Sequence, residues 1–192
     1  MKRLLLLLPS NSYRASAFLA ACREIEARVV IGVDEAQAST HFGDSSVVQF
    51  NFSDPVLGSE EIKAFSTANR VDVIVPAEEE AVLLAAHAAQ ALRLVHNDVN
   101  AVAATRDKHK LREILTEAGL PQPLYKSLVD LRDLDDPYPV GFPCVIKPTN
   151  LSASRGVVRV NDAPELREAF SRVLDILGGS RGAMPLLEEY LP

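Results

Sequence analysis

The sequence predicts an α/β protein, with a Rossmann-like parallel sheet first and a smaller α+β unit after it. Short apolar runs alternate with helical patterns over residues 4–92, which is typical of parallel strands joined by helices. The pattern changes near residue 105, and a Pro- and Asp-rich connection at residues 121–141 precedes two further β-branched runs. With 192 residues, of which 47% are hydrophobic, two small domains can form. We place them at residues 1–104 and 105–192.

The elements of the first domain follow from its apolar runs. The first strand is expected at residues 4–8, where five leucines end at Pro9. The following elements are strands at residues 28–33, 47–52, 71–75 and 94–95, and helices at 13–27, 55–69 and 81–92. Because several of the strands are continuously apolar, we expect helices on both faces of the sheet.

Composition excludes several classes of protein. The net charge of −6 gives no basis for nucleic-acid binding. Lys2 and Arg3 before the leucines imitate a secretory signal, but five leucines are fewer than the roughly 7–15 apolar residues of such signals. No stretch is long enough to span a membrane. Cys22 and Cys144 lie in separate apolar stretches, as in a protein with reduced thiols, so we expect a cytoplasmic protein without a membrane partner.

Polar residues follow two strands of the predicted sheet. Ligands of open α/β sheets bind beyond the carboxyl ends of the strands. The residues at these ends are Ser10, Asn11 and Ser12 after the first strand, and Glu78, Glu79 and Glu80 after the fourth. The first turn lacks G-x-G-x-x-G, which argues against a nicotinamide or flavin cofactor. The three glutamates also have a simpler interpretation, as carboxylates favoured by a helix dipole.

A cationic helix is expected at residues 106–118, with Thr105 as its N-cap and Gly119 after its end. Its first turns carry Arg106, Lys108, His109 and Lys110. Positive charge at a helix N-terminus opposes the macrodipole. Such a helix therefore needs either an anion nearby or full solvation of these side chains.

The stretch at residues 142–156 carries most of the chemistry. An apolar strand ends in Lys147, and a lysine at that position is costly unless its ammonium meets an anion. A second strand is expected at residues 157–160, a helix at 164–177, a flexible turn at 178–182 and a last strand within 184–192. The loop between the first two strands offers hydroxyl groups, a guanidinium and backbone N–H groups from Ser152, Ser154, Arg155 and Gly156. This inventory suits a phosphate, although an ordinary hairpin with a polar loop is the alternative.

In their order and spacing, these motifs resemble the ATP-grasp superfamily of ligases. Asp107-Lys108 opens a helix, and residues 142–148 are similar to the family's F-P-hydrophobic-hydrophobic-K-P strand. Residues 152–157 stand where its flexible phosphate loop belongs, and Leu187-Glu-Glu-Tyr-Leu191 is similar to its E-x-Y-L adenine hinge. Residues 1–104 resemble the N-terminal, pre-ATP-grasp domain of biotin carboxylases and carbamoyl-phosphate synthetases. The resemblance covers the whole chain, although the hinge motif alone also fits an amphipathic strand.

The resemblance implies an ATP site. Lys108 and Lys147 would bind the phosphates, with the loop folded over them. Glu188 would accept a hydrogen bond from the adenine amine, and the other hinge residues are Glu189, Tyr190 and Leu191. Mg²⁺ ligands and catalytic residues lie on later strands of the family's fold, so we expect no metal site in residues 1–192. A chain ending at Pro192 would hold the first half of the ATP-grasp domain and be inactive by itself.

The implied reaction joins a small-molecule carboxylate to an amine through an acyl phosphate, with MgATP. The acceptor substrate would bind near Ser10, Asn11, Ser12, Glu79 and Glu80. The loop has one glycine where the family carries several, so it should be stiffer. Two alternatives stay open: an enzyme that uses bicarbonate, as biotin carboxylases and carbamoyl-phosphate synthetases do, and a non-catalytic module for a small metabolite. An exposed sheet edge at residues 186–191 would also allow a homodimer.

Overall fold

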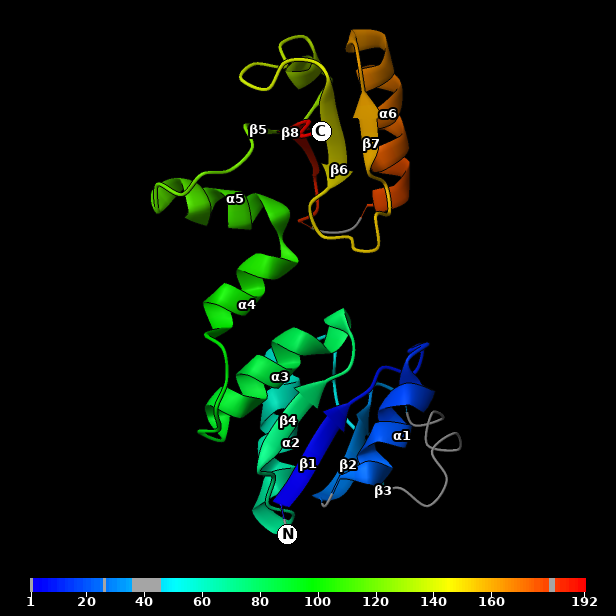
Figure 1. The fold of residues 1–192 in the computed structure, drawn as a ribbon, viewed down its shortest axis with the longest axis vertical. Helices are drawn as coiled ribbons and strands as arrows, with labels where there is room; N and C mark the ends of the chain where they lie inside the picture. Colours follow the sequence, from blue (N-terminus) through cyan, green and yellow to red (C-terminus); the bar gives the residue numbers. More distant parts are fainter. Residues whose placement is uncertain (1, 26, 36–45, 180–181) are drawn as a thin grey trace. The chain divides into compact units, whose positions relative to one another are not determined.

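The computed structural model describes residues 2–25, 27–35, 46–179 and 182–192. The chain divides into two compact units, Met1–Val102 and Ala103–Pro192 (Figure 1). Each unit has its own four-stranded sheet. Among the described residues, no helix is long and apolar enough to cross a membrane.

The first unit is built on a parallel sheet in the order β3-β2-β1-β4. Its strands are β1 (Lys2–Leu7), β2 (Ala27–Val33), β3 (Ser46–Gln49) and β4 (Val73–Pro76). The helices are α1 (Ala15–Glu24), α2 (Pro55–Ala68) and α3 (Glu79–Ala91). Figure 1 shows α1 on one side of the sheet and α2 with α3 on the other. This arrangement confirms the predicted Rossmann-like parallel sheet.

The leucine run of β1 is buried on both faces of this sheet. Leu5 and Leu7 belong to the core beneath α2 and α3, whereas Leu6 and Leu8 belong to the core beneath α1. All four are at most 1% exposed. Alternate strand residues point to opposite faces, so an unbroken apolar run is what a doubly covered strand requires.

One glycine sets how closely α2 approaches its neighbours. A Cβ atom on Gly58 would lie 2.1 Å from the carbonyl oxygen of Asn51 and 2.8 Å from Leu84 Cδ1. Helix α2 starts nearby at the N-cap Asp54, whose carboxylate accepts hydrogen bonds from the backbone N–H groups of Val56 and Leu57. The glycine therefore lets the helix lie against the segment that follows β3.

The second unit is an α+β arrangement, as predicted. Its antiparallel sheet has the order β5-β8-β6-β7. The strands are β5 (Tyr125–Ser127), β6 (Cys144–Pro148), β7 (Val158–Val160) and β8 (Pro185–Glu189), with the helices α5 (Lys108–Glu117), η2 (Leu131–Leu134) and α6 (Ala163–Leu177). Ile146 and Leu187 join Phe170 of α6 in the core of this unit. Helix α6 thus covers one face of the sheet.

Two sequence-based expectations are wrong. The strand expected at residues 94–95 is an irregular segment, in which the Leu94 N–H donates to Ala89 O at 2.8 Å and Val95 is fully exposed. The single helix expected from Thr105 is two helices, α4 (Val99–Arg106) and α5, and Thr105 lies inside α4. The N-cap of α5 is Asp107, which accepts from the N–H groups of His109 and Lys110 at 2.9 and 3.3 Å. Its carboxylate also offsets the cationic first turn.

Candidate functional site

A cluster of opposite charges lies on the face of the second sheet that α6 leaves uncovered. Ile146 points into the core with α6, so Lys147, the next residue of β6, points to the other face. Glu188 of β8 lies diagonally across from it in the strand register. The Lys147 Nζ atom lies 2.5 Å from Glu188 Oε2. The lysine predicted to need an anion therefore meets a carboxylate of its own chain.

Arg112 of α5 completes this cluster. Its Nε donates to Glu188 Oε1 at 3.0 Å and its Nη2 donates to Glu188 Oε2 at 3.3 Å. The side chains of Arg112, Glu188 and Lys147 are 16%, 5% and 17% exposed. We call these three residues the charge triad. It holds two cations and one carboxylate, so it carries a net positive charge in a largely buried place.

The charge triad keeps its carboxylate ionised. Burial raises the pKa of Glu188, but the hydrogen bonds and the positive charges of Arg112 and Lys147 together outweigh that effect and hold this pKa below its ordinary value. At neutral pH the buried carboxylate is thus paired with both cations. Such pairing is what makes a buried charge tolerable.

Lys108, the first residue of α5, contacts the residues that lead into the expected phosphate loop. Its backbone N–H donates to Thr149 O at 2.9 Å, and its Nζ donates to Leu151 O at 2.5 Å and to Thr149 O at 3.4 Å. Thr149 is fixed in turn by Met184, to whose carbonyl its N–H donates at 3.0 Å. The first residue of α5 therefore holds the first residues of the loop.

The loop itself presents exposed polar groups. Ser152, Ser154 and Arg155 are all exposed, and the Arg155 N–H donates to Ser152 O at 3.1 Å. Ala153 and Ser154 have φ of 52° and 58°, and Gly156 has φ of 73°. Because a Cβ atom at Gly156 would lie 2.9 Å from Pro148 Cγ, that position suits glycine alone.

The expected adenine hinge has distinct surroundings at each residue. The Glu189 N–H donates to Leu124 O at 2.9 Å, and Glu189 Oε2 accepts from the Leu124 N–H at 3.2 Å. The Tyr190 ring lies 4.2 Å from the guanidinium carbon of Arg159 on β7, a cation–π contact. Leu191 is 61% exposed. Glu189 is thus engaged by the backbone of Leu124, while Leu191 is open to solvent.

Sequence reasoning missed Arg112 and Arg159. A signal for the first was available: Glu188 interrupts an apolar run, and a carboxylate at a buried strand position needs a cation. That signal does not say which cation, because Arg112 lies 76 residues away in the sequence. Arg159 stands on a short strand with no comparable signal.

In the first unit, the structure joins the two strand ends that carry the expected substrate residues. The Ser12 hydroxyl donates to Glu78 Oε1 at 2.7 Å, and the Ser10 N–H donates to Asp34 Oδ1 at 2.8 Å. Asn11 is exposed, and Glu79 and Glu80 lie in the first turn of α3. The carboxylates at this helix start also fit the simpler interpretation, stabilisation by the helix dipole.

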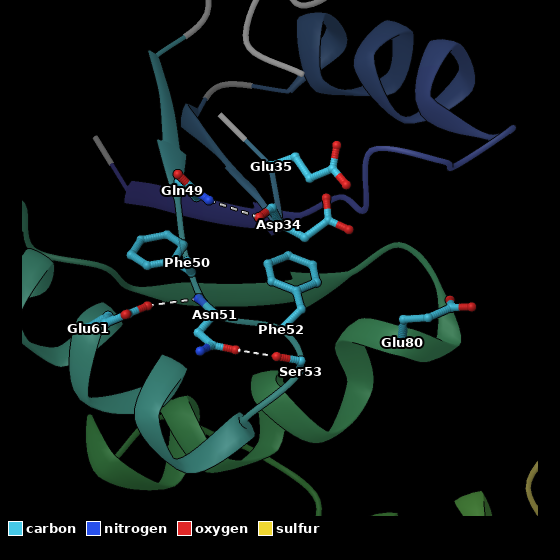
Figure 2. A pocket seen from close by; sticks show the side chains of 9 residues that line it. All are labelled: Asp34, Glu35, Gln49, Phe50, Asn51, Phe52, Ser53, Glu61 and Glu80. Atoms are coloured by element: carbon cyan, nitrogen blue, oxygen red, sulfur yellow. Dashed lines mark hydrogen bonds between the residues drawn. The ribbon is translucent and has the colours of Figure 1, made fainter. Parts of the chain in front are cut away.

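An open hollow of about 880 Å³ lies at the carboxyl ends of β2 and β3 (Figure 2). It is lined by Asp34, Glu35, Gln49, Phe50, Asn51, Phe52, Ser53, Glu61 and Glu80. Glu61 Oε2 accepts from the Asn51 N–H at 2.8 Å. Of the expected substrate residues, Glu80 alone is in this lining. In the described part of the chain, no three His, Cys, Asp or Glu side chains are arranged to hold a metal ion.

Parts of the chain are similar to known proteins. Residues 140–185 match the ATP-grasp domain family. The chain is 38% identical over 84 residues to a D-alanine–D-alanine ligase of Bacillus cytotoxicus, a match that covers 40% of this chain and 23% of the ligase. It is 31% identical over 118 residues to a formate-dependent phosphoribosylglycinamide formyltransferase of Cupriavidus metallidurans, covering 58% of this chain and 29% of that enzyme. The matches thus span about a quarter of each relative's length.

Solved structures extend the likeness to the fold of the whole chain. The crystal structure of an L-amino acid ligase from Bacillus licheniformis superposes with a TM-score of 0.75 at 23% identity, covering 100% of this chain and 47% of that one. The chain is therefore an α/β protein with a fold like that of about half of this L-amino acid ligase. The family match is thus confined to residues 140–185, and the likeness over the whole chain is one of fold.

Proposed function

We propose that the second unit binds ATP and belongs to a ligase that joins a carboxylate to an amine. The observation that carries this proposal is the net positive charge triad on the uncovered face of the sheet, in the same unit as the loop that Lys108 holds. A buried excess of positive charge is costly unless an anion compensates it. A nucleotide triphosphate is an anion of this kind, and the match of residues 140–185 to the ATP-grasp domain family supports it.

The residues of this unit fit the parts of ATP. Lys147 and Lys108 would meet the phosphates as point charges, and Ser152, Ser154, Arg155 and Gly156 would add hydroxyl, guanidinium and N–H donors. The hinge at residues 188–191 would hold the adenine. The Glu188 carboxylate has room for about four hydrogen bonds, and the charge triad uses three of them. One position is left for the adenine amine.

For the complete enzyme, the proposed reaction transfers the terminal phosphoryl group of ATP to a carboxylate. An amine then attacks the acyl phosphate, so a C–N bond forms and phosphate leaves. In phosphoryl transfer the protein contributes mainly positioning and charge stabilisation. Mg²⁺ would accompany the nucleotide. The proteins similar to this chain include a D-alanine–D-alanine ligase and an L-amino acid ligase, which supports substrates of this class.

The acceptor substrate would bind at the carboxyl edge of the first sheet, near Ser10, Asn11, Ser12, Glu79 and Glu80. The charges that line the hollow in that unit favour an ammonium group over a carboxylate as its ligand. Its lining includes the acidic side chains Asp34, Glu35, Glu61 and Glu80, and negative side chains attract a cation and repel an anion. We therefore assign this hollow to the amine substrate.

Calorimetric titration of the chain with the non-hydrolysable analogue AMPPNP tests the ATP site. Lys147→Ala should weaken binding by about tenfold or more, because it removes the charge nearest the expected phosphates. Lys63→Ala is the matched control, since Lys63 is an exposed lysine of α2 and its loss changes the net charge equally. Equal affinity of Lys147→Ala and wild-type protein would remove Lys147 from the site and refute the proposal.

A further inference from the structure

We infer that Arg112 is a positioning residue of the ATP site, which acts through Glu188 to leave the Lys147 ammonium available to phosphate. This inference rests on the proposed ATP-binding function. Arg112 itself is not expected to contact the nucleotide. Its role is to occupy the carboxylate that would otherwise neutralise Lys147.

The geometry of Arg112 is that of a fixed partner. Two of its nitrogen atoms, Nε and Nη2, bind the two oxygens of Glu188. Bidentate pairs of arginine with carboxylate are both stronger and more directional than single contacts. The main chain at this residue is held as well, because its carbonyl accepts from Thr116 Oγ1 at 2.8 Å and from Gln122 Nε2 at 2.9 Å. Both ends of Arg112 are therefore anchored.

The position of Arg112 on α5 links the two expected phosphate ligands. Arg112 comes four residues after Lys108, so both lie on the same side of the helix, about one turn apart. Lys108 contacts the loop at Thr149 and Leu151, whereas Arg112 contacts the sheet at Glu188. One turn of α5 thus holds the loop backbone through Lys108 and the Glu188 carboxylate through Arg112.

The effect on Lys147 follows from charge. Without Arg112, Glu188 and Lys147 would form a neutral pair, and a phosphate would have to compete with the carboxylate for the ammonium. With Arg112 present, the three side chains carry one excess positive charge. Because each is at most 17% exposed, solvent screens these interactions only weakly. The excess charge can then be compensated by a phosphate without breaking any pair.

A purely structural role makes different predictions. If Arg112 only fastened α5 to the sheet, its loss would weaken every ligand alike, and removing Glu188 as well would add to the damage. If Arg112 acts through Glu188, its loss should weaken phosphate binding selectively. In that case Glu188→Gln should restore much of the affinity, since it frees Lys147 from its carboxylate while leaving an amide oxygen in place.

The experiment measures calorimetric affinities of the full 192-residue chain for AMPPNP and for adenosine. The variants are Arg112→Met, Arg112→Lys, Arg112→Met/Glu188→Gln and, as the control, Arg172→Met, which removes an exposed arginine of α6. Arg112→Met should lose about tenfold in AMPPNP affinity and little in adenosine affinity. Arg112→Lys and the double variant should both recover most of the loss, and the control should match wild-type protein.

Other outcomes would overturn the inference. An equal loss for both probes, or a double variant weaker than Arg112→Met, would leave Arg112 with a structural role alone. If Arg112→Met does not fold, as circular dichroism would reveal, Arg112→Lys and the double variant still decide the matter: both must bind AMPPNP close to wild type. Should Arg112→Met keep full affinity while Lys147→Ala loses it, the inference fails and the ATP site stands. Should both keep full affinity, the ATP site fails as well.

Discussion

Glu188 lies in β8, directly after the buried residues Leu186 and Leu187. Its side chain is 5% exposed, yet it is ionised because Arg112 and Lys147 hydrogen-bond to it. A buried carboxylate with two cationic partners contributes to stability only while it stays charged. The stability of the second unit should therefore depend on pH through this one residue.

The sign of this dependence follows from the lowered pKa. The contribution of Glu188 is fully present above the unfolded pKa of about 4.5 and is lost as pH falls through the lower folded value. At pH 7, Glu188→Gln should lower the free energy of unfolding by about 3 kcal/mol, because it leaves two cations without their carboxylate. The difference between the variants should shrink below pH 4.5. Urea unfolding from pH 7 to pH 3 measures it, and a difference that is constant with pH would contradict the pairing.

At the scale of single residues, the sequence indicated which charged residues are unusual but did not identify the residues that they contact. Lys147 was singled out because a lysine at the end of an apolar strand is costly without an anion, and Glu188 because residues 187–191 resemble an adenine hinge. Their direct contact was not foreseen, since strand register is not readable from one strand alone. Ligand binding by these residues stays a prediction.

Among the elements, α2 depends on close approach rather than on helix propensity. Gly58 sits inside the helix, where alanine would normally be about 1 kcal/mol more favourable. The Cβ atom of an alanine would, however, overlap the Asn51 carbonyl oxygen at 2.1 Å. A backbone oxygen cannot move aside as easily as the end of a flexible side chain can. The packing requirement therefore overrides the propensity.

Gly58→Ala should consequently destabilise the first unit by about 2 kcal/mol, the usual scale of overpacking. Lys63→Ala, at an exposed site of the same helix, should change the free energy of unfolding by less than about 0.5 kcal/mol. Chemical denaturation of both variants provides the comparison. A Gly58→Ala variant as stable as wild-type protein would show that α2 can shift without cost.

The elements themselves were largely predictable. Alternation of apolar runs and helical patterns was enough for β1, β2, β4 and the helices between them. The ends of the elements were harder to predict. Asp107 and Thr105 are both good N-caps, and the sequence alone did not show which of them begins a helix. In the structure α4 ends at Arg106, and Asp107 is the N-cap of α5. The strand expected at residues 94–95 failed because two apolar residues are too short a pattern to separate a strand from a turn.

At the scale of the whole molecule, the two units have separate cores. Phe170 and Leu166 belong to the core of the second unit, and Ile62 belongs to a core of the first. The division into domains at residues 1–104 and 105–192 remains a prediction. If the units are separate domains, a substitution that destabilises one core should destabilise that unit alone.

Leu166→Ala and Ile62→Ala test this requirement as a pair, since both side chains are fully buried. Each should cost about 3 kcal/mol. Hydrogen exchange followed by mass spectrometry should show faster exchange in β6, β8 and α6 for the first variant, and in β1, α2 and α3 for the second. Faster exchange throughout the chain in either variant would mean that the two units unfold as one.

The contact between Lys108 and the loop has a further consequence. An ammonium group has three hydrogen-bond donors, and the Leu151 and Thr149 carbonyl oxygens both accept from Lys108. A phosphate that draws the ammonium away from these two oxygens would release the loop backbone. Anion binding and loop release are then linked reciprocally: the factor by which loop release strengthens anion binding is the factor by which the bound anion favours loop release.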